Sequence, residues 1–516
     1  MLYEGKAGLN AASKLKKKYV YFFGGDKTEG KRDLKNLLGG KGSNLAEMSS
    51  LGINVPPGFT ITTEACLYFF QNQKKIPPGL WDEVKKYFVQ LEELMGRKFG
   101  DPSDPLLVSV RSGARVSMPG MMDTVLNLGL NDETVKGLAQ ITEKPRFAYD
   151  CYRRLIAMFG NVVLGMDSQL FEDILIKKKS RQKIKWDTDL TAQDLQAIIK
   201  KYKPLVKKYT GKEFSQDPNE QLKMAVEAVF NSWNTERATT YRRLNRIPAD
   251  WGTAVNVQAM VFGNLGDHSA TGVAFTRNPA TGEKKFYGEY MANAQGEDVV
   301  AGIRTPQPIS QLEQDMPEVY EMLVQVYKKL ENHFKDMQDL EFTVENNLLY
   351  LLQTRSGKRT AAAAIKIAID MVNEGFISKQ EALMRVPANQ LDKVFHPMID
   401  PKAKYKVLAK GLGASPGSAT GKIVFTPEHA LEMADQKEKV ILVRMETSPE
   451  DINGMNVAQG ILTAKGGMTS HAAVVARAMG KPCVSGCGEL SVNMKRKKCT
   501  LNGVQLKEYD SITLDG

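Results

Sequence analysis

The chain reads Gly466-Gly467-Met468-Thr469-Ser470-His471 at the point where a glycine-rich turn passes into the apolar run Ala472-Ala473-Val474-Val475-Ala476. The apolar run favours a helix, and a helix N-terminus points unpaired N–H groups and the positive end of its dipole outward. An imidazole there is biased towards its neutral, nucleophilic form, and the same N–H groups would stabilise a phosphoryl group on it. The stretch predicts that His471 accepts a phosphoryl group. An isolated histidine near a helix start more often has a structural role, so the rest of the chain must decide.

Length and composition exclude several classes of protein. The chain has 516 residues and a formal net charge of +11, and its length predicts about three or four domains. The surplus of lysine and arginine is scattered, and its densest runs lack interleaved aromatic residues, so we expect no nucleic-acid partner. No apolar run approaches the length of a membrane span, so we expect no membrane contact.

The cysteines indicate a reducing compartment. Five cysteines are few and odd in number for a chain of this length, which argues against a disulfide framework. We therefore expect a cytoplasmic protein. Residues 1–19 form a basic N-terminal extension with a weak likeness to an organelle-targeting segment, which leaves a plastid or glycosome as the alternative.

A large α+β unit is predicted between residues 20 and 358. Residues 77–204 are mainly helical, because their apolar residues recur at spacings of three and four. The unit also carries two strand-like stretches separated by glycine and asparagine, and a hairpin whose turn is Glu345-Asn346-Asn347. The other predicted elements are a helix at Ser43–Ser50, strands at Phe59–Thr62, 254–261 and 272–276, a helix at 317–335, and hairpin strands at 340–344 and 348–353.

The remainder is predicted to form a linker and a second unit of the α/β class. Residues 359–412 contain an alanine-rich helix at Ala361–Val372 and a loose stretch at Pro387–Pro401 that is the candidate linker. Residues 413–516 alternate strand and helix patterns, as an α/β domain does. The predicted strands are Lys422–Phe425, Val440–Arg444 and Gly460–Thr463.

Two short motifs are suited to holding phosphate. Leu38-Gly39-Gly40-Lys41-Gly42 combines a flexible backbone with one lysine, as a phosphate cradle would, although it is not the P-loop pattern. Arg111 and Arg115 leave the end of an apolar strand beside Met118-Pro119-Gly120, and a guanidinium group matches two phosphate oxygens at once. Taken alone, each motif is also consistent with a surface lysine or a surface ion pair.

Acidic and amide side chains converge on the predicted hairpin. Asp339 and Glu341 are two residues apart on one strand and therefore point to one face of it. Gln353 on the next strand would lie beside them, with Arg355 two residues further on. Such oxygens suit Mg2+ bound together with substrate phosphates, whose remaining charge Arg355 would balance. The alternative is a charged hairpin that faces solvent.

Together these segments resemble the pyruvate, phosphate dikinase family. The resemblance is collinear from about Leu37 to the last residue, and long loops match as well as the candidate site residues. The segments that carry it are Leu38–Met48, Arg111–Arg115, Gln295–Gly302, Arg304–Gln307, Asp339–Phe342, Leu352–Arg355, Ala414–Gly417 and Gly467–Ala472.

The resemblance implies a multidomain fold. Residues 20–358 would be an ATP-grasp nucleotide-binding domain with helical insertions, residues 359–412 a helical segment and linker, and residues 413–516 a swivelling phosphohistidine domain. The family continues into a C-terminal (β/α)8 barrel that binds phosphoenolpyruvate and pyruvate. Because this chain stops at Gly516, we expect the barrel and its pyruvate site to be absent from it. The chain would then be a fragment, or a protein able to run only the nucleotide half of the reaction, and the full-length protein would be a homodimer.

The resemblance also implies a set of ATP-binding residues. Some of them would hold the phosphates, three would receive adenine largely through backbone groups, and Glu341 and Gln353 would bind Mg2+ with the ATP. The set is Lys41, Arg111, Gln258, Met260, Val261, Asp339, Glu341, Gln353 and Arg355.

In the implied reaction, His471 attacks the β-phosphorus of ATP and releases AMP. Orthophosphate then takes the terminal phosphoryl group as pyrophosphate, and the phosphohistidine passes its group to pyruvate. Residue spacing alone indicates only phosphoryl transfer to His471. Since one histidine serves two distant sites, its domain must move, and we expect the hinge near residues 387–413. Thr469 matches a threonine that a regulatory kinase and phosphatase modify in plant members of the family.

Two other functions remain open at this point. Phosphoenolpyruvate synthase would use water in place of orthophosphate, although Met468 and the long matching loops favour the dikinase. A non-enzymatic phosphocarrier would only receive phosphate on His471, and the candidate ATP site argues against it.

Overall fold

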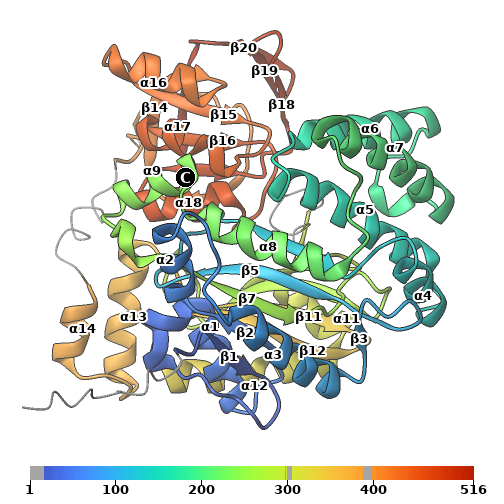
Figure 1. The fold of residues 1–516 in the computed structure, drawn as a ribbon. Helices are drawn as coiled ribbons and strands as arrows, with labels where there is room; N and C mark the ends of the chain where they lie inside the picture. The colour runs from blue at the N-terminus through green and yellow to red at the C-terminus, as the bar shows by residue number, and fades with distance from the viewer. Residues whose placement is uncertain (1–16, 297, 299–304, 387–396, 401) are drawn as a thin grey trace, which may run out of the picture.

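The computed structural model describes residues 17–296, 298, 305–386, 397–400 and 402–516. Three sequence predictions lie wholly or partly outside these residues: most of the N-terminal extension, part of the segments Gln295–Gly302 and Arg304–Gln307, and most of the candidate linker. In the described part, a large unit with a helical insertion lies below a smaller C-terminal unit, which is coloured orange to red in Figure 1.

The first sheet of the large unit is antiparallel and five-stranded, in the order β1-β2-β7-β5-β6. The predicted strands at Phe59–Thr62 and 254–261 are confirmed as β2 and β7, and β7 is buried along its whole length. The stretch 77–204 is mainly helical, as predicted, but it also contributes four strands, of which β5 pairs with the distant strand β7. The bounds are β1 Val20–Phe23, β2 Gly58–Ile61, β5 Val108–Ala114, β6 Thr124–Leu128 and β7 Thr253–Ala259, with a separate pair β3 Lys98–Phe99 and β4 Pro105–Leu106.

The second sheet is also antiparallel and follows the order β10-β9-β8-β11-β12. The predicted hairpin is confirmed, and its turn residues Asn346 and Asn347 both have positive φ, as the tight hairpin turn requires. The strand predicted at 272–276 is β8, which lies between β9 and β11. The bounds are β8 Ala270–Phe275, β9 Tyr287–Ala292, β10 Gln307–Pro308, β11 Gln338–Glu345 and β12 Leu348–Ser356.

Helix α1 (Lys35–Ser50) joins the two sheets and contains the first phosphate motif. It starts eight residues before the predicted Ser43, and Gly39 breaks it with φ 69° and ψ 174°, values that only glycine adopts without strain. A Cβ at Gly39 would lie 1.8 Å from the carbonyl oxygen of Gly113 in β5. Asn44 in turn donates to the carbonyl of Thr354 in β12 at 2.8 Å. The helix therefore holds Lys41 between the two sheets.

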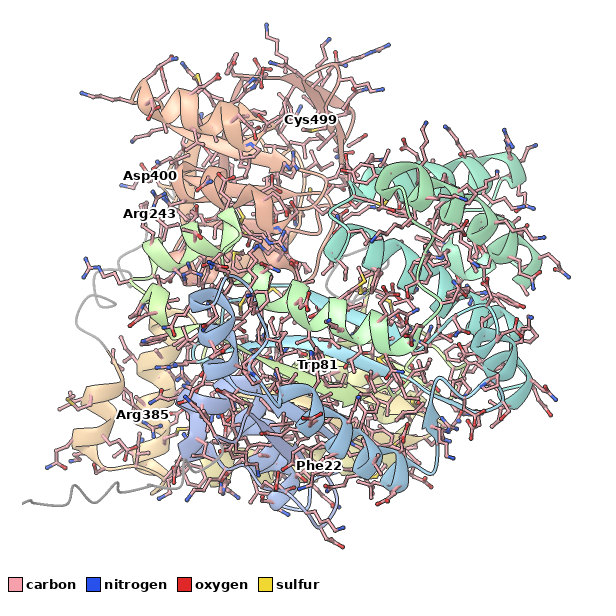
Figure 2. The ribbon with its side chains drawn as sticks, viewed as in Figure 1. Phe22, Trp81, Arg243, Arg385, Asp400 and Cys499 are labelled. Carbon is pink, nitrogen blue, oxygen red and sulfur yellow. The ribbon has the colours of Figure 1, made fainter. Side chains whose placement is uncertain are left out.

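The remaining helices of the large unit cover its sheets and form the insertion on the right of Figure 1. Apolar side chains from the insertion and from the helices that cover the first sheet merge into one core, to which Phe22 and Trp81, both labelled in Figure 2, contribute. The bounds are α2 Thr63–Gln71, α3 Leu80–Met95, α4 Thr134–Ile141, α5 Pro145–Val162, α6 Ser168–Gln182, α7 Ala192–Thr210, α8 Pro218–Ser232, α9 Glu236–Leu244, α11 Leu312–Asp315 and α12 Pro317–Phe334.

Two helices, α13 (Ala361–Asn373) and α14 (Lys379–Arg385), follow the second sheet. The predicted helix at 361–372 is thus confirmed. A buried arginine, Arg277, fixes this segment to the large unit, because it pairs with Glu331 of α12 at 3.0 Å and with Glu374, just after α13, at 2.7 Å.

The C-terminal unit is built on a six-stranded sheet in the order β13-β17-β16-β15-β14-β21. Its four central strands are parallel and its two edge strands antiparallel, so the α/β prediction for residues 413–516 is confirmed. A small three-stranded sheet, β18-β19-β20, is attached to it. The bounds are β13 Leu412–Ser415, β14 Ser418–Val424, α16 Pro427–Asp435, β15 Val440–Arg444, α17 Ile452–Val457, β16 Gly460–Thr463, α18 His471–Met479, β17 Cys483–Ser485, β18 Leu490–Asn493, β19 Lys498–Leu501, β20 Val504–Lys507 and β21 Ser511–Asp515.

Among the helices of the described residues, none combines the length and the apolar composition that crossing a membrane would require.

Candidate functional site

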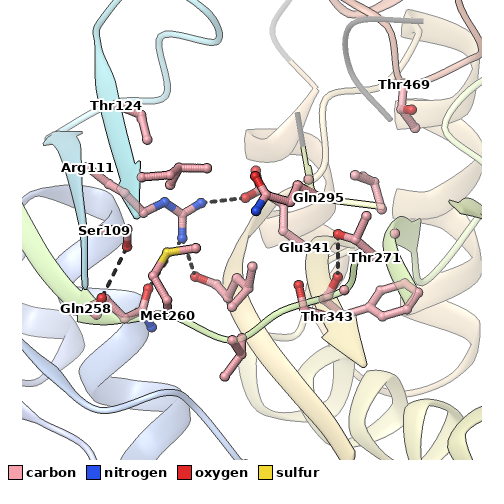
Figure 3. Close-up of a pocket in the computed structure, with 18 of the residues that line it drawn as sticks. Ser109, Arg111, Thr124, Gln258, Met260, Thr271, Gln295, Glu341, Thr343 and Thr469 are labelled. Carbon is pink, nitrogen blue, oxygen red and sulfur yellow. Dashed lines mark hydrogen bonds and ion pairs between the residues drawn. The ribbon is translucent and has the colours of Figure 1, made fainter. Parts of the chain in front are cut away.

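A cavity of about 290 Å³ lies between the two sheets of the large unit. Strands β5 and β7 form one wall, and β8, β11 and β12 form the other, as Figure 3 shows in part. Two residues of the C-terminal unit complete the lining, so the cavity belongs to both units. The lining includes Ser109, Arg111, Thr124, Leu126, Gln258, Met260, Val261, Thr271, Gln295, Asp339, Glu341, Phe342, Thr343, Leu352, Arg355, Thr469 and Val474.

Charged side chains reach across the cavity from both walls. Arg111 donates to Glu341 at 2.8 Å and to the carbonyl of Leu352 at 3.2 Å, and Figure 3 shows the first of these contacts. Arg355 donates to Asp339 at 2.7 Å. Asp339 lies opposite Arg355 and Glu341 opposite Gln353 in the pairing of β11 with β12, which confirms the predicted arrangement of the hairpin.

The two carboxyl groups respond differently to this environment. Burial would raise the pKa of Glu341, but Arg111, Arg355 and Lys41 together outweigh it and hold that pKa below its ordinary value. Burial dominates at Asp339 and raises its pKa in spite of Arg355. The site therefore contains a firmly ionised carboxylate beside one that is short of compensating positive charge.

Lys41, held by α1 between the two sheets, adds a third cation close to Arg111 and Arg355. Its pKa lies well below the usual value because of burial and the repulsion of Arg111 and Arg355. Among the described residues, no carboxylate lies within ion-pair distance of Lys41. A polyanion bound in the cavity would relieve this crowding of positive charge.

The oxygen atoms of this wall fit a hard divalent cation. Asp339 Oδ1 is buried and has no hydrogen-bond partner in the described part of the chain, and Glu341 and Gln353 are direct cross-strand neighbours. The described residues contain no cluster of three or more His, Cys, Asp or Glu side chains able to hold a metal by themselves. Two carboxylates and an amide, completed by water and phosphate oxygens, are the ligand set that Mg2+ accepts.

Most of the predicted nucleotide residues line the cavity, but Lys41 and Gln353 are not among its lining residues. The side-chain amide of Gln258 is occupied by Arg111 and by the carbonyl of Pro56, and its backbone carbonyl accepts from the hydroxyl of Ser109 at 3.3 Å. The prediction missed several uncharged lining residues. The alternation of side chains along β5 and β11 was a usable signal for Ser109, two residues from Arg111, and for Thr343, two residues from Glu341. The missed residues are Ser109, Phe342, Thr343, Thr124, Leu126, Thr271, Leu352 and Val474.

His471 is the first residue of α18, as predicted, and Ser470 caps the helix. Its Nδ1 lies 3.0 Å from the hydroxyl of Thr447, while its Nε2 is buried and has no partner among the described residues. Burial lowers the pKa of His471 to about 4, with a smaller opposing effect from Glu450. The ring is therefore neutral at physiological pH, with one nitrogen fixed by a hydroxyl and the other free to react.

The low pKa of His471 predicts an unusual titration. Of the five histidines in the chain, His471 should stay neutral down to about pH 4, whereas an exposed imidazole titrates near pH 6.5. The docked state binds this proton less readily than a displaced or unfolded state, in which the imidazole has its ordinary pKa near 6.5. The contribution of neutral His471 to the free energy of the docked state is therefore full above pH 6.5 and declines as the pH falls towards 4. NMR of the labelled imidazoles would measure this, with His471→Asn to assign the signal. Titration of all five rings near pH 6.5 would contradict it.

The C-terminal unit is docked on the large unit around this histidine. Glu289 of β9 accepts from the amide of Met468 at 3.3 Å and from the hydroxyl of Thr469 at 3.1 Å. Arg237 of α9 pairs with Glu450 at 2.8 Å, and the ring of Tyr287 packs against the core of the C-terminal unit. These contacts bring the histidine loop to the edge of the cavity.

Gly120 allows a close approach between the units. A Cβ on it would lie 3.2 Å from Cδ2 of His471 and 3.1 Å from Cγ of Pro449, and its φ is +71°. Both the space and the backbone angle therefore favour glycine. The loop that follows Arg115 thus covers the histidine, a role that its glycine and methionines alone did not indicate.

Two protein-family models match the chain in sequence order. The model described as "Pyruvate phosphate dikinase, AMP/ATP-binding domain" matches residues 35–80, 72–319 and 312–375. The model described as "PEP-utilising enzyme, mobile domain" matches residues 436–516. The first match covers the two sheets that enclose the cavity except for β1, and the second covers the part of the C-terminal unit that carries His471.

Curated relatives are similar over nearly the whole chain. Pyruvate, phosphate dikinase of Clostridium symbiosum is 57% identical over 502 residues, which are 97% of this chain and 57% of the relative. The enzyme of the same name from Rhizobium meliloti is 54% identical over 97% of this chain and 57% of its own length. The chloroplastic enzyme of Flaveria pringlei is 55% identical over 97% of this chain and 52% of its own length. The chain thus spans about half the length of these relatives.

Proposed function

The chain belongs to the pyruvate phosphate dikinase family, and we propose that it carries the nucleotide half of a dikinase reaction through a phosphohistidine at His471. The observation that carries the proposal is the state of this side chain. Its Nε2 is unpartnered and its pKa is about 4, and the loop before it lines the cavity between the two sheets. The whole reaction would convert ATP, pyruvate and phosphate to AMP, phosphoenolpyruvate and pyrophosphate, reversibly.

The large unit would bind ATP in the cavity as an ATP-grasp domain. Gln258, Met260 and Val261 lie where β7 ends and would receive adenine through backbone groups. Lys41, Arg111 and Arg355 supply the positive charge that the triphosphate requires. Asp339, Glu341 and Gln353 would hold Mg2+, which would neutralise part of the phosphate charge when bound.

The first step would be attack by Nε2 of His471 on the β-phosphorus, with AMP as the leaving group. We propose that Nδ1–H of His471 donates to the hydroxyl of Thr447, 3.0 Å away, which would leave the lone pair of the neutral ring on Nε2. Orthophosphate would then attack the terminal phosphorus, release pyrophosphate and leave one phosphoryl group on His471. Transfer of that group to pyruvate is proposed only for a protein of the relatives' full length, in which the unit would swing away from the cavity. Residues 387–413 would contain the hinge.

The fate of the terminal phosphoryl group tests this proposal against its nearest rival. The chain is incubated with Mg2+, orthophosphate and ATP labelled at either the β- or the γ-phosphorus. We expect AMP to form, the β-label to appear on phosphohistidine and the γ-label to appear in pyrophosphate. Orthophosphate released without added phosphate would favour phosphoenolpyruvate synthase instead, and labelling without AMP formation would favour a phosphocarrier.

Thr447 is expected to set the reactive nitrogen of His471. Thr447→Val removes the hydroxyl 3.0 Å from Nδ1, and we expect phosphohistidine formation to slow about tenfold, the equivalent of about one hydrogen bond. Single-turnover labelling from ATP measures the rate. Thr447→Ser keeps the hydroxyl and should retain most of it, so equal losses in both variants would argue that the hydroxyl has no such role.

Thr469 is proposed as a site of regulatory phosphorylation by a dedicated kinase and phosphatase. Its hydroxyl donates to Glu289, and the side chain is buried in the docked state. A phosphate there would place a dianion against a carboxylate and separate the units.

We also propose three properties of the whole protein. Its domains would span residues 20–358, 359–412 and 413–516, it would form a homodimer, and it would be cytoplasmic or organellar.

A further inference from the structure

Arg477 is a buried cation of the C-terminal unit that the proposed mechanism does not use. It lies on α18, six residues after His471, and is 6% exposed. Its guanidinium donates to the carbonyls of Ala414 in β13, at 2.8 Å, and of Met468. Its Nε has no partner, and no carboxylate lies within ion-pair distance of it among the described residues. A buried charge left in this state is costly unless something nearby compensates for it.

The carboxylates that act on Arg477 come from the large unit. Burial lowers the pKa of Arg477, while the charges of Asp339 and Glu289 act in the opposite direction. Arg477 in turn lowers the pKa of Glu289, which burial raises. These effects require the two units to be docked, because the partners lie on different units.

Met468 connects the two opposite charges. Its amide donates to Glu289 at 3.3 Å, while its carbonyl accepts from Arg477. Thr469, the next residue, donates its hydroxyl to the same carboxylate at 3.1 Å. The loop that contains Met468 and Thr469 is therefore bound by Arg477 of its own unit and by Glu289 of the large unit. His471 lies two residues after Thr469.

We propose that Arg477 is a positioning residue that forms the docking shape of loop Gly466–Ser470 and supplies the positive charge that matches Glu289 across the interface. Its effect on the reaction passes through docking, so it rests on the proposed role of His471 as the phosphoryl acceptor. Without Arg477, the carbonyl of Met468 loses a charge-assisted hydrogen bond and Glu289 faces a loop with no positive charge behind it.

If the role of Arg477 were purely structural, its hydrogen bonds would hold β13 and the loop against α18 equally well whether the C-terminal unit is docked on the large unit or not. Such a role would affect every reaction of His471 equally. A docking role would affect only reactions that need the cavity of the large unit. Phosphoramidate separates the two, because it transfers its phosphoryl group to imidazole with loss of ammonia and needs no nucleotide site.

The test compares ATP and phosphoramidate as donors to His471 in the chain and in Arg477→Met. We expect labelling from ATP to slow about tenfold to 100-fold, the effect of losing a hydrogen bond to a charged group, and labelling from phosphoramidate to stay within about twofold. Arg477→Lys keeps the charge and should recover part of the ATP rate. Lys481→Met, which removes a half-buried cation just beyond the end of α18, is the matched control and should not change either rate.

A double-mutant cycle with Glu289→Gln locates the effect. If Arg477 acts through this contact, Arg477→Met should add little to the loss already caused by Glu289→Gln. Multiplicative losses, equal losses with both donors, or an unchanged ATP rate would each overturn the proposal. Hydrogen exchange at the Met468 amide tests it separately. Protection should fall in both single variants even if the parent chain takes no label from ATP, an outcome that would refute the proposed function alone.

Discussion

His471→Asn should take up no label from ATP labelled at the β-phosphorus. Asparagine can still contact Thr447 through its amide, but it has no basic nitrogen at the position of Nε2 and cannot form a stable phosphoryl adduct. The measurement is covalent label in acid-sensitive form after denaturation, at saturating Mg2+ and ATP. We expect the loss to be complete because a phosphohistidine route has no alternative acceptor.

The matched control for this prediction is His429→Asn. His429 lies on α16 of the same unit, where it contacts Glu508 at 2.7 Å, away from the cavity. This variant should be labelled like the parent chain. Label that persists in His471→Asn would contradict the assignment of His471 as the acceptor. Loss of label in His429→Asn would mean that the C-terminal unit does not tolerate a histidine-to-asparagine substitution.

Glu341→Gln should slow phosphohistidine formation about 10²- to 10³-fold, the size of effect seen when one preorganised electrostatic contact to a transition state is removed. The carboxylate is ionised because Arg111, Arg355 and Lys41 outweigh its burial. Glutamine preserves the shape of the side chain and can still accept from Arg111. It removes the negative charge that compensates Arg111, Arg355 and Lys41. Mg2+ would lose a charged ligand at the same time.

Titration of the labelling rate with Mg2+ measures this effect. We expect Glu341→Gln to require more Mg2+ and to remain slow at saturation. Glu321→Gln, an exposed glutamate on α12, is the control and should behave like the parent chain. A parental rate for Glu341→Gln at high Mg2+ would show that Glu341 serves only to balance Arg111.

Local patterns predicted the hairpin and the helix that follows the histidine. Asp339, Glu341 and Gln353 belong to strands joined by a two-residue turn, and the alternation of side chains on paired strands fixes which of them share a face. The helix start at His471 follows from glycines, a serine cap and an apolar run, all within ten residues. Such features depend on neighbours in sequence, so the sequence is sufficient to predict them.

Contacts between distant segments could not be predicted in this way. Glu289 and Thr469 are 180 residues apart, and nothing in either segment indicates that they meet. Thr447 lies 24 residues before His471 in another loop of the same unit. The sequence marks Arg477 only as a lone arginine within an apolar helix. It does not identify the groups that surround its side chain.

The sequence by itself determined which chemistry the Gly466–His471 stretch can support, because a nucleophilic imidazole at a helix start depends on a few consecutive residues. Only the tertiary structure decided how reactive that imidazole is. Its pKa of about 4 results mainly from burial, the contact that holds its Nδ1 comes from Thr447, and its place beside the cavity depends on Glu289. Burial and cross-domain contacts are properties of the packed chain, since they sum over residues that meet only after folding.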